Sequence, residues 1–407
     1  MATWTVSRRT VLAAAAAGLA GASPLRAFAA AADPIPVGVL TPLTGAGGPF
    51  GAEMQKAITG AVERINAAGG PLGRRIRLFV EDSQTNPEAA VRGVKKLIDV
   101  NRVVAVIGSW ASGETLAVAP ICIENKVVQM STSGASRITE IQKRGFVYRT
   151  EPDDAFFGRA FAQYALGSGA RRTAALELQV PYADSMVAAF RAGIEAGGGQ
   201  FAERVTYAEN QPNYRAEVDR VVRSRAEVVL VAGYEPDTAQ ILKDAYQAGF
   251  KGQFLAPGFS VTADLLANVG RGPAEGLVML NEGVAGGSRA HEAFLALMGE
   301  RKPYPFASQA YDQIQLVALA IEAAGTASGE AINRTMRQVS GPDGVAVVGF
   351  EEGAKRLREG QRINYEGASG PIDFDEHGNI SRGNFSVAKV EQGRIVETGK
   401  TITVSLR

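Results

Sequence analysis

The chain of 407 residues has a single cysteine, Cys122, so it cannot form an internal disulfide bond. Cys122 lies in the apolar stretch 118–123, where a buried small side chain is more typical than a reactive thiol. Only two histidines occur, and neither His291 nor His377 has a partner at a metal-ligand spacing. The sequence therefore indicates neither a disulfide scaffold nor a metal site.

The chain also has no excess of charge of one sign, because it contains 43 basic and 42 acidic residues. Without a clustered basic face we expect no nucleic-acid partner. The motifs H-E-x-x-H, C-x-x-C and G-x-S-x-G are absent. The glycines between 45 and 51 form neither G-x-G-x-x-G nor a phosphate-binding loop. We therefore predict a protein that is not an enzyme and holds no cofactor, with a hydrolase or nucleotide enzyme as a weaker alternative.

Long hydrophobic runs are missing as well. The most apolar segment, 13–22, is followed by Pro24 and Arg26 before it reaches the roughly 20 residues that span a bilayer. Arg8 and Arg9 precede this segment and small residues follow it, as in a secretory signal peptide. No cysteine follows the run, which excludes a bacterial lipid anchor. Residues 1–32 are therefore predicted to be an export signal.

The export signal resembles a twin-arginine signal peptide, because Ser7, the two arginines and Leu12 match its core. An ordinary secretory route remains open. The small residues at 27–32 predict cleavage near Ala29 or Ala32. We expect an exported mature chain that begins near residue 33.

The mature chain repeats one architectural rhythm twice, with strands alternating with helices. The first set has expected strands at 35–41, 75–81, 103–107 and 127–130, with helices at 52–67, from 86 to about 100 and from Ser112. The second set has strands at 173–178, 201–207, 228–231 and 254–256, with helices at 183–196, 214–224 and 236–248. Such alternation predicts parallel sheets covered by helices on both faces.

The last third of the chain departs from this rhythm. Helices are expected at 291–301, 307–324 and 330–339, and strands at 371–374 and 384–390 with a hairpin turn between them at 375–379. These helices suggest that the chain returns to its first half. We predict an α/β fold of two doubly wound Rossmann-like lobes joined by a multi-strand hinge: 33–150 plus 283–368 form lobe 1, and 151–282 plus 369–407 form lobe 2. Ligands of such sheets bind beyond the carboxyl ends of the strands, which places a site in the cleft between the lobes.

Several segments together resemble the Leu/Ile/Val-binding family of type I periplasmic binding proteins, the solute receptors of ABC importers. The resemblance covers nearly all of the mature chain. The residues that match the family pattern are 37–45, Gly51, Ala57, Gly60, Ala61, 65–70, 81–83, 106–108, 310–312 and 370–378. Each motif alone is weak, but their order and spacing are fairly specific. The resemblance implies a periplasmic protein that closes around a small solute.

The resemblance also implies where a carboxylate is held. In the family this role belongs to a serine that begins the helix after the third strand, here Ser112, and a helix N-terminus suits an anion. Ser112 could equally cap its own helix. Further contacts are implied for Ser133 and Ala135 in the loop after the fourth strand. Ala135 stands where the family often has threonine, so Ser136 could supply that hydroxyl. A plain serine-rich loop is the alternative.

The resemblance implies aromatic side chains on both walls of the cleft between the lobes. Phe50 and Trp110 would line the first wall, and Tyr182 and Tyr234 the second. Each could instead be an ordinary surface aromatic residue.

One departure concerns the ligand's ammonium group. Amino-acid receptors of the family carry an acid after the eighth strand, where this chain has Gly258. Because a buried ammonium without a counter-charge is costly, either Glu235 or Glu282 replaces that acid or the ligand has no ammonium. Phe259 favours an aromatic or apolar ligand.

The expected function is capture of an amino acid, branched-chain-like, or a related small carboxylate. The expected partners are the solute and an ABC permease and ATPase complex at the inner membrane, and the receptor is expected to be a monomer. Aromatic carboxylates, urea and short amides are alternative ligands. A sensory module that reports ligand state to a membrane partner is an alternative function.

Overall fold

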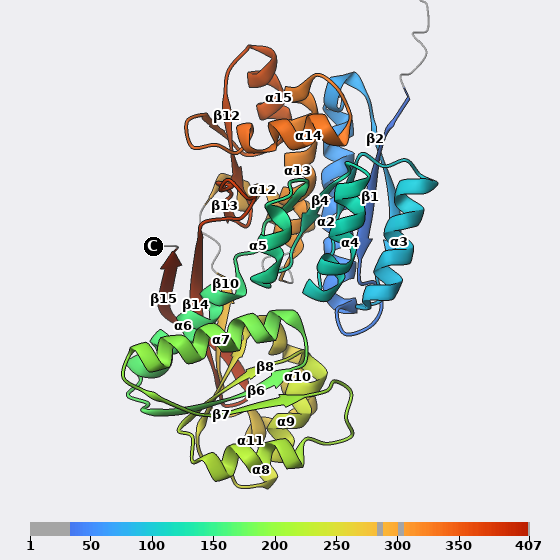
Figure 1. The fold of residues 1–407 in the computed structure, drawn as a ribbon. Helices are drawn as coiled ribbons and strands as arrows, with labels where there is room; N and C mark the ends of the chain where they lie inside the picture. Colours follow the sequence, from blue (N-terminus) through green and yellow to red (C-terminus); the bar gives the residue numbers. More distant parts are fainter. Residues whose placement is uncertain (1–32, 283–287, 300–304, 406–407) are drawn as a thin grey trace, which may run out of the picture. The chain divides into compact units, whose positions relative to one another are not determined.

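The computed structural model describes residues 33–282, 288–299 and 305–405. The expected export signal, 1–32, lies outside these residues. Two large sheets and one small sheet organise the chain from Pro34 onward (Figure 1). In the described parts of the chain, no helix is long and apolar enough to cross a membrane.

The first sheet has the order β2-β1-β3-β4-β5, and all of its strand pairs are parallel. Its strands are β1 (Ile35–Thr41), β2 (Ile76–Asp82), β3 (Ala105–Ile107), β4 (Val128–Ser131) and β5 (Val147–Arg149). The helices that connect them are α2 (Gly48–Ala67), α3 (Pro87–Asp99), α4 (Ser112–Glu124) and α5 (Arg137–Gln142). This confirms the four strands expected in the first half and adds β5.

Both faces of the first sheet are covered. Val37 and Val39 of β1 pack in one core with α2 and α13 (Ala307–Ala324). Leu40 of the same strand packs in a second core with α3 and α4. Cys122 is fully buried in that second core, as its apolar surroundings predicted, and burial raises the pKa of its thiol to about 12. Alternation of side chains along β1 therefore supplies both layers.

The second sheet has the order β15-β14-β10-β9-β8-β6-β7. Its strands are β6 (Arg172–Leu178), β7 (Gln200–Tyr207), β8 (Val228–Ala232), β9 (Gln253–Pro257), β10 (Val278–Glu282), β14 (Arg382–Glu391) and β15 (Arg394–Ser405). The helices are α6 (Asp154–Gly167), α7 (Pro181–Ala196), α8 (Arg215–Ser224), α9 (Glu235–Gln247), α10 (Ala263–Val269) and α11 (Arg271–Ala274). In Figure 1, α6 and α7 cover one face of this sheet, and α8, α9 and α11 lie on the other.

The second sheet is mixed rather than purely parallel. Its β6 to β10 pairs are parallel, but β14 pairs antiparallel with both β10 and β15. The prediction that a turn at 375–379 joins strands 371–374 and 384–390 into a hairpin was wrong. Phe374 forms only an isolated bridge with Ile380, and Pro371 belongs to β13, which pairs with β12. The real hairpin joins β14 to β15.

The return part of the chain contains α12 (Arg289–Met298), α13, α14 (Gly329–Thr335) and α15 (Phe350–Arg358), with a small sheet of β11 (Val345–Val347), β12 (Ile363–Gly367) and β13 (Gly370–Pro371). The helix expected at 291–301 ends at Met298, where Gly299 takes a left-handed conformation. The helix expected to reach 339 ends at Thr335 and continues as the 3-10 turn Met336–Gln338.

The chain crosses between the two large sheets after β5, after β10 and before β14. The segment just before the third crossing contacts the first sheet's elements, because Asn379 bonds to Arg149 and Gly378 to Gln142. We propose that the two sheets form the cores of two lobes, and that the second lobe resumes at β14 rather than at residue 369.

Candidate functional site

One pocket lies where the carboxyl ends of strands from both sheets meet. Its cavity volume is about 30 Å³, within about 310 Å³ of space between atoms that includes open solvent. The residues that line it are Trp110, Ala111, Ser112, Thr132, Gly134, Glu151, Asp154, Tyr182, Tyr234, Phe259 and Phe306. Four of the residues proposed from the sequence are among them, namely Trp110, Ser112, Tyr182 and Tyr234.

The N-terminus of α4 forms one side of the pocket. The helix begins at Ser112, and its N-cap residue is Ala111, which has no side chain able to cap the first turn. Ser112 therefore does not cap its own helix. Its Oγ accepts a hydrogen bond from the Ala135 amide at 3.2 Å. An uncapped first turn leaves backbone N–H groups and the positive end of the helix dipole available to an anion.

An acid of this first turn, Glu114, makes one contact at the helix N-terminus. Glu114 accepts a hydrogen bond from the Ala111 amide at 3.2 Å. Burial raises the pKa of Glu114 to about 7. Near neutral pH its carboxyl is therefore partly protonated, which weakens its competition with an incoming anion for the helix terminus.

The loop after β4 lines the pocket beside Ser112. Thr132 and Gly134 line the pocket, whereas Ser133 and Ala135, the positions proposed from the sequence, do not. The Ser133 hydroxyl points to the segment between β3 and α4 and donates to the Trp110 carbonyl at 2.8 Å. Ala135 is fully buried and holds Ser112 through its amide. These two residues shape the loop from behind.

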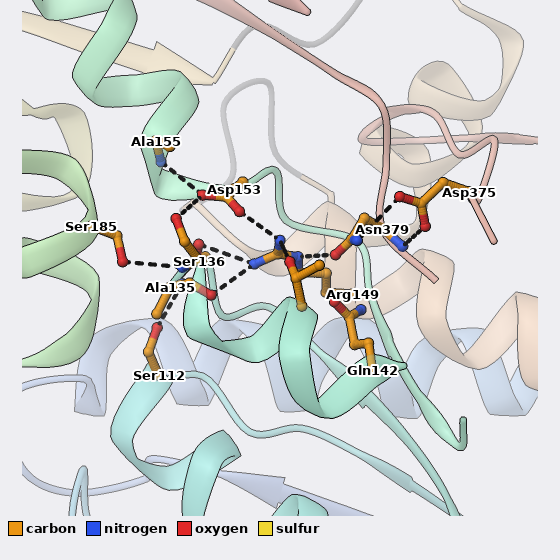
Figure 2. Close-up of polar contacts among 12 residues, drawn as sticks. Ser112, Ala135, Ser136, Gln142, Arg149, Asp153, Ala155, Ser185, Asp375 and Asn379 are labelled. Atoms are coloured by element: carbon orange, nitrogen blue, oxygen red, sulfur yellow. Dashed lines mark hydrogen bonds and ion pairs between the residues drawn. The ribbon is translucent and has the colours of Figure 1, made fainter. Parts of the chain in front are cut away.

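Arg149 fixes this loop from the far side (Figure 2). Its guanidinium donates to the carbonyls of Gly134 and Ala135 at 3.0 and 3.1 Å, and forms an ion pair with Asp153 at 3.0 Å. Asp153 in turn accepts a hydrogen bond from the Ser136 hydroxyl and caps α6 through the Ala155 amide. A fully buried arginine with all these partners rigidifies the loop because each donor is satisfied.

Six aromatic side chains form a closed ring of contacts at the pocket. Successive ring centroids lie 5.3 to 5.7 Å apart, in the order Phe50, Trp110, Tyr234, Tyr182, Phe259 and Phe306, with Phe306 returning to Phe50. Phe50 stacks on Trp110 without lining the pocket. Phe259 and Phe306 were not among the proposed site residues. Phe306 precedes α13, whose place beside the pocket no local pattern reveals.

An acid at position 258 would require the Asn281 side chain to move. A Cβ at this position would overlap the Asn281 side-chain oxygen. The two acids considered as substitutes also lie outside the pocket lining. Glu235 accepts a hydrogen bond from Thr262 at 2.7 Å, and Glu282 from Gln309 at 2.6 Å.

Two other acids line the pocket instead, Glu151 and Asp154. Both follow β5 in the first crossing between the sheets. The stretch 151–154 is visibly acidic in the sequence, but without β5 nothing placed it beside Ser112. These acids are the main part of the site that the sequence analysis missed.

Asp154 is 4% exposed, and its Oδ2 atom is buried without a hydrogen-bond partner among the described residues. Burial and the nearby charge of Asp153 raise its pKa well above the usual range, and Arg149 opposes the shift. The Thr132 and Tyr182 hydroxyls are likewise buried without partners among the described residues. Three unpaired polar groups of pocket-lining residues indicate a site built for polar contacts that a ligand would supply.

The described residues contain no group of three or more His, Cys, Asp or Glu side chains placed to hold a metal ion.

The comparisons with known proteins agree with this architecture. A model of the periplasmic binding protein family matches residues 34–394, so the chain belongs to that family of solute-binding proteins. A Leu/Ile/Val-binding protein homologue of Brucella melitensis is 26% identical over 375 residues, which cover 91% of this chain and 95% of the relative.

Solved structures give the same result. A leucine-binding protein of Thermotoga maritima has a TM-score of 0.78 and 26% identity, covering 90% of this chain and 98% of that one. A solute-binding protein of R. palustris in complex with benzoate has a TM-score of 0.74 and 21% identity, covering 90% and 96%. The second likeness shows the shared fold alone.

Proposed function

We propose that the chain is the exported solute receptor of an ABC importer, and that it captures an amino acid in the pocket between its two lobes. The observation that carries this proposal is the pairing of two opposite electrostatic features in one pocket. The uncapped N-terminus of α4 attracts an anion, and the buried Asp154 carboxylate attracts a cation. A free amino acid carries both charges on adjacent atoms.

In this proposal the solute's carboxylate accepts hydrogen bonds from the first-turn amides of α4 and from the Ser112 hydroxyl. Ser133, Ala135 and Ser136 hold the loop that positions Ser112. The solute's ammonium group lies against Asp154, with Glu151 on the same side of the pocket. This assignment replaces Glu235 and Glu282 as the candidate ammonium partners.

The aromatic ring supplies the apolar part of the site. Trp110, Tyr182 and Tyr234 line the pocket directly, and Phe50 supports Trp110. Phe259 also lines the pocket, and it follows Gly258, where a larger residue would meet Asn281. An apolar side chain buried among these rings gains roughly 25 cal/mol per Å² removed from water. The names of the relatives, which include leucine-binding proteins, support a branched-chain solute.

In this proposal the receptor delivers its solute to a permease and ATPase in the inner membrane. It acts as a monomer without catalysis, and residues 1–32 are a twin-arginine-like export signal. Closure of the lobes about the three crossings would bury the solute.

A second candidate, an aromatic carboxylate without an ammonium group, is favoured by the six aromatic rings. It leaves the buried Asp154 side chain without a partner from the solute, which makes it the weaker candidate.

Calorimetric titration against a fixed panel tests the function. The panel contains L-leucine, L-isoleucine, L-phenylalanine, benzoate, urea and acetamide. We expect saturable one-site binding of at least one amino acid and a rise in melting temperature with its concentration. Binding of benzoate alone would support the second candidate. The absence of binding across amino acids and aromatic acids alike would overturn the proposed class of solute.

A further inference from the structure

Two carboxyl groups, that of the buried Glu151 and that of the half-buried Glu282, lie together in the described part of the chain. Glu151 lies in the first crossing of the chain between the sheets, and Glu282 ends β10 just before the second crossing. Gln309, in the first turn of α13, donates through Nε2 to Glu282 at 2.6 Å and to Glu151 at 3.3 Å. One amide group therefore holds both carboxyls together.

The surroundings offer little to neutralise two negative charges. Glu151 is 3% exposed. Among the described residues, Asp154 repels both carboxylates, and beside Asp154 the side chains of Asp153 and Arg149 pair with each other. Within the described ranges, no lysine or arginine forms an ion pair with Glu151 or Glu282. Two carboxylates this close cannot both remain ionised at low cost.

We propose that Glu151 and Glu282 share one proton in a carboxyl–carboxylate hydrogen bond that joins the first and second crossings of the chain. The shared proton makes the pair a proton-binding site in the hinge. Loss of this proton would place two like charges across the crossings and loosen them. The proposal concerns the fold itself and does not depend on which solute the pocket takes.

The electrostatics of the pair agree with this geometry. Burial is the main cause that raises the pKa of Glu282, to about 7. Burial and the charge of Glu282 raise the pKa of Glu151 well above its usual range. The folded chain therefore holds a proton that the unfolded chain releases near pH 4.5. Folding stability contributed by the pair is present at low pH and is lost as the pH rises toward and beyond 7.

Carbon-13 NMR of full-length protein labelled at the glutamate side-chain carboxyl tests the proposal directly. Glu151→Gln and Glu282→Gln each remove one resonance and so assign the pair. In the parent protein we expect one carboxyl of the pair to titrate near pH 7 or above. In Glu282→Gln, the Glu151 resonance should titrate at a lower pH than in the parent, because the charge of Glu282, which raises the pKa of Glu151, has gone. Titration of both parent carboxyls below pH 5 would overturn the proposal, as would an unchanged Glu151 titration in Glu282→Gln.

Thermal unfolding provides an independent measure. When the pH rises from 5 to 8, the melting temperature of the parent should fall by at least about 2 °C more than that of Glu151→Gln or Glu282→Gln. Glu391→Gln, which removes an exposed glutamate of β14, is the matched control and should follow the parent. Glu114 and Asp312 are buried elsewhere and stay the same in every variant. Equal pH dependence in all four proteins would contradict the shared proton, and so would a titration that moves with added Ca²⁺ or Mg²⁺, which would indicate a bound cation instead.

Discussion

The backbone amide of Ser136 donates a hydrogen bond to the Ser185 hydroxyl over 3.0 Å. Ser136 belongs to the loop after β4 of the first sheet, and Ser185 lies on α7, which packs on the second sheet. The same hydroxyl donates to the Pro181 carbonyl at 3.0 Å, so its orientation is fixed. This bond connects the two walls of the proposed solute pocket (Figure 2).

Ser185→Ala should therefore weaken solute binding by loosening the closed form. Loss of one neutral hydrogen bond is worth about 0.5–1.5 kcal/mol, a two- to tenfold rise in Kd. The change should lie mainly in the dissociation rate, which stopped-flow fluorescence with L-leucine measures. Ser168→Ala, at the far end of α6, is the control and should leave the rate unchanged. Equal rates in both variants would remove Ser185 from the closing contact.

Ser112→Ala should weaken binding of any carboxylate solute. A hydrogen bond to a charged group is worth about 1.5–3 kcal/mol, so Kd should rise at least about tenfold. Calorimetry with L-leucine measures the change. Ser224→Ala removes a hydroxyl from α8, which lies outside the pocket lining, and serves as the control. If the two variants bind equally well, the solute carboxylate lies elsewhere.

Asp154→Asn should separate solutes with an ammonium group from those without one. The variant should lose about tenfold or more in affinity for L-leucine and little for 4-methylpentanoate, the same molecule without its amine. In the parent, burial raises the pKa of Asp154, so leucine affinity should fall as the pH is lowered through that pKa and the carboxyl becomes neutral. Equal losses for both solutes would contradict an ammonium contact.

Gly258→Ala should destabilise the fold by overpacking. The added Cβ would meet Asn281, and such overpacking costs about 1–3 kcal/mol. Chemical denaturation measures the loss, which Asn281→Ala should partly restore in the double variant. Gly167→Ala is a control, because its Cβ meets no atom within 4 Å. A Gly258→Ala variant as stable as the parent would contradict overpacking, because it would show that the Asn281 side chain moves away at no cost.

The alternation of strands and helices was readable from the sequence because it is a local pattern. Strand β1 was predicted with its observed bounds, because the apolar run that begins at Ile35 ends at Thr41 and Pro42 follows. The short strand β5 and the antiparallel pair β14 and β15 were harder. Val147, Tyr148 and Arg149 give no periodic signal, and β14 owes its place to pairing with β10, far away in the sequence.

The site was predictable where a side chain follows directly from its element. Ser112 and Trp110 come just after β3, and Tyr234 just after β8, at the carboxyl ends of predicted strands. Asp154, Glu151 and Phe306 were missed because their positions depend on the crossings and on α13. Ser133 was expected in the pocket, yet its hydroxyl turns away to the Trp110 carbonyl, a choice that only the folded loop decides.

The central claim is that a small solute enters the pocket beside Trp110. The chain has two tryptophans, Trp4 and Trp110, so a Trp4→Phe chain leaves Trp110 as the sole tryptophan. Fluorescence of this variant reports directly on a pocket-lining ring. Titration with L-leucine should produce a saturable change in Trp110 emission with the Kd found by calorimetry. Saturable calorimetric binding that leaves Trp110 emission unchanged would contradict the claim, because it would place the solute outside this pocket.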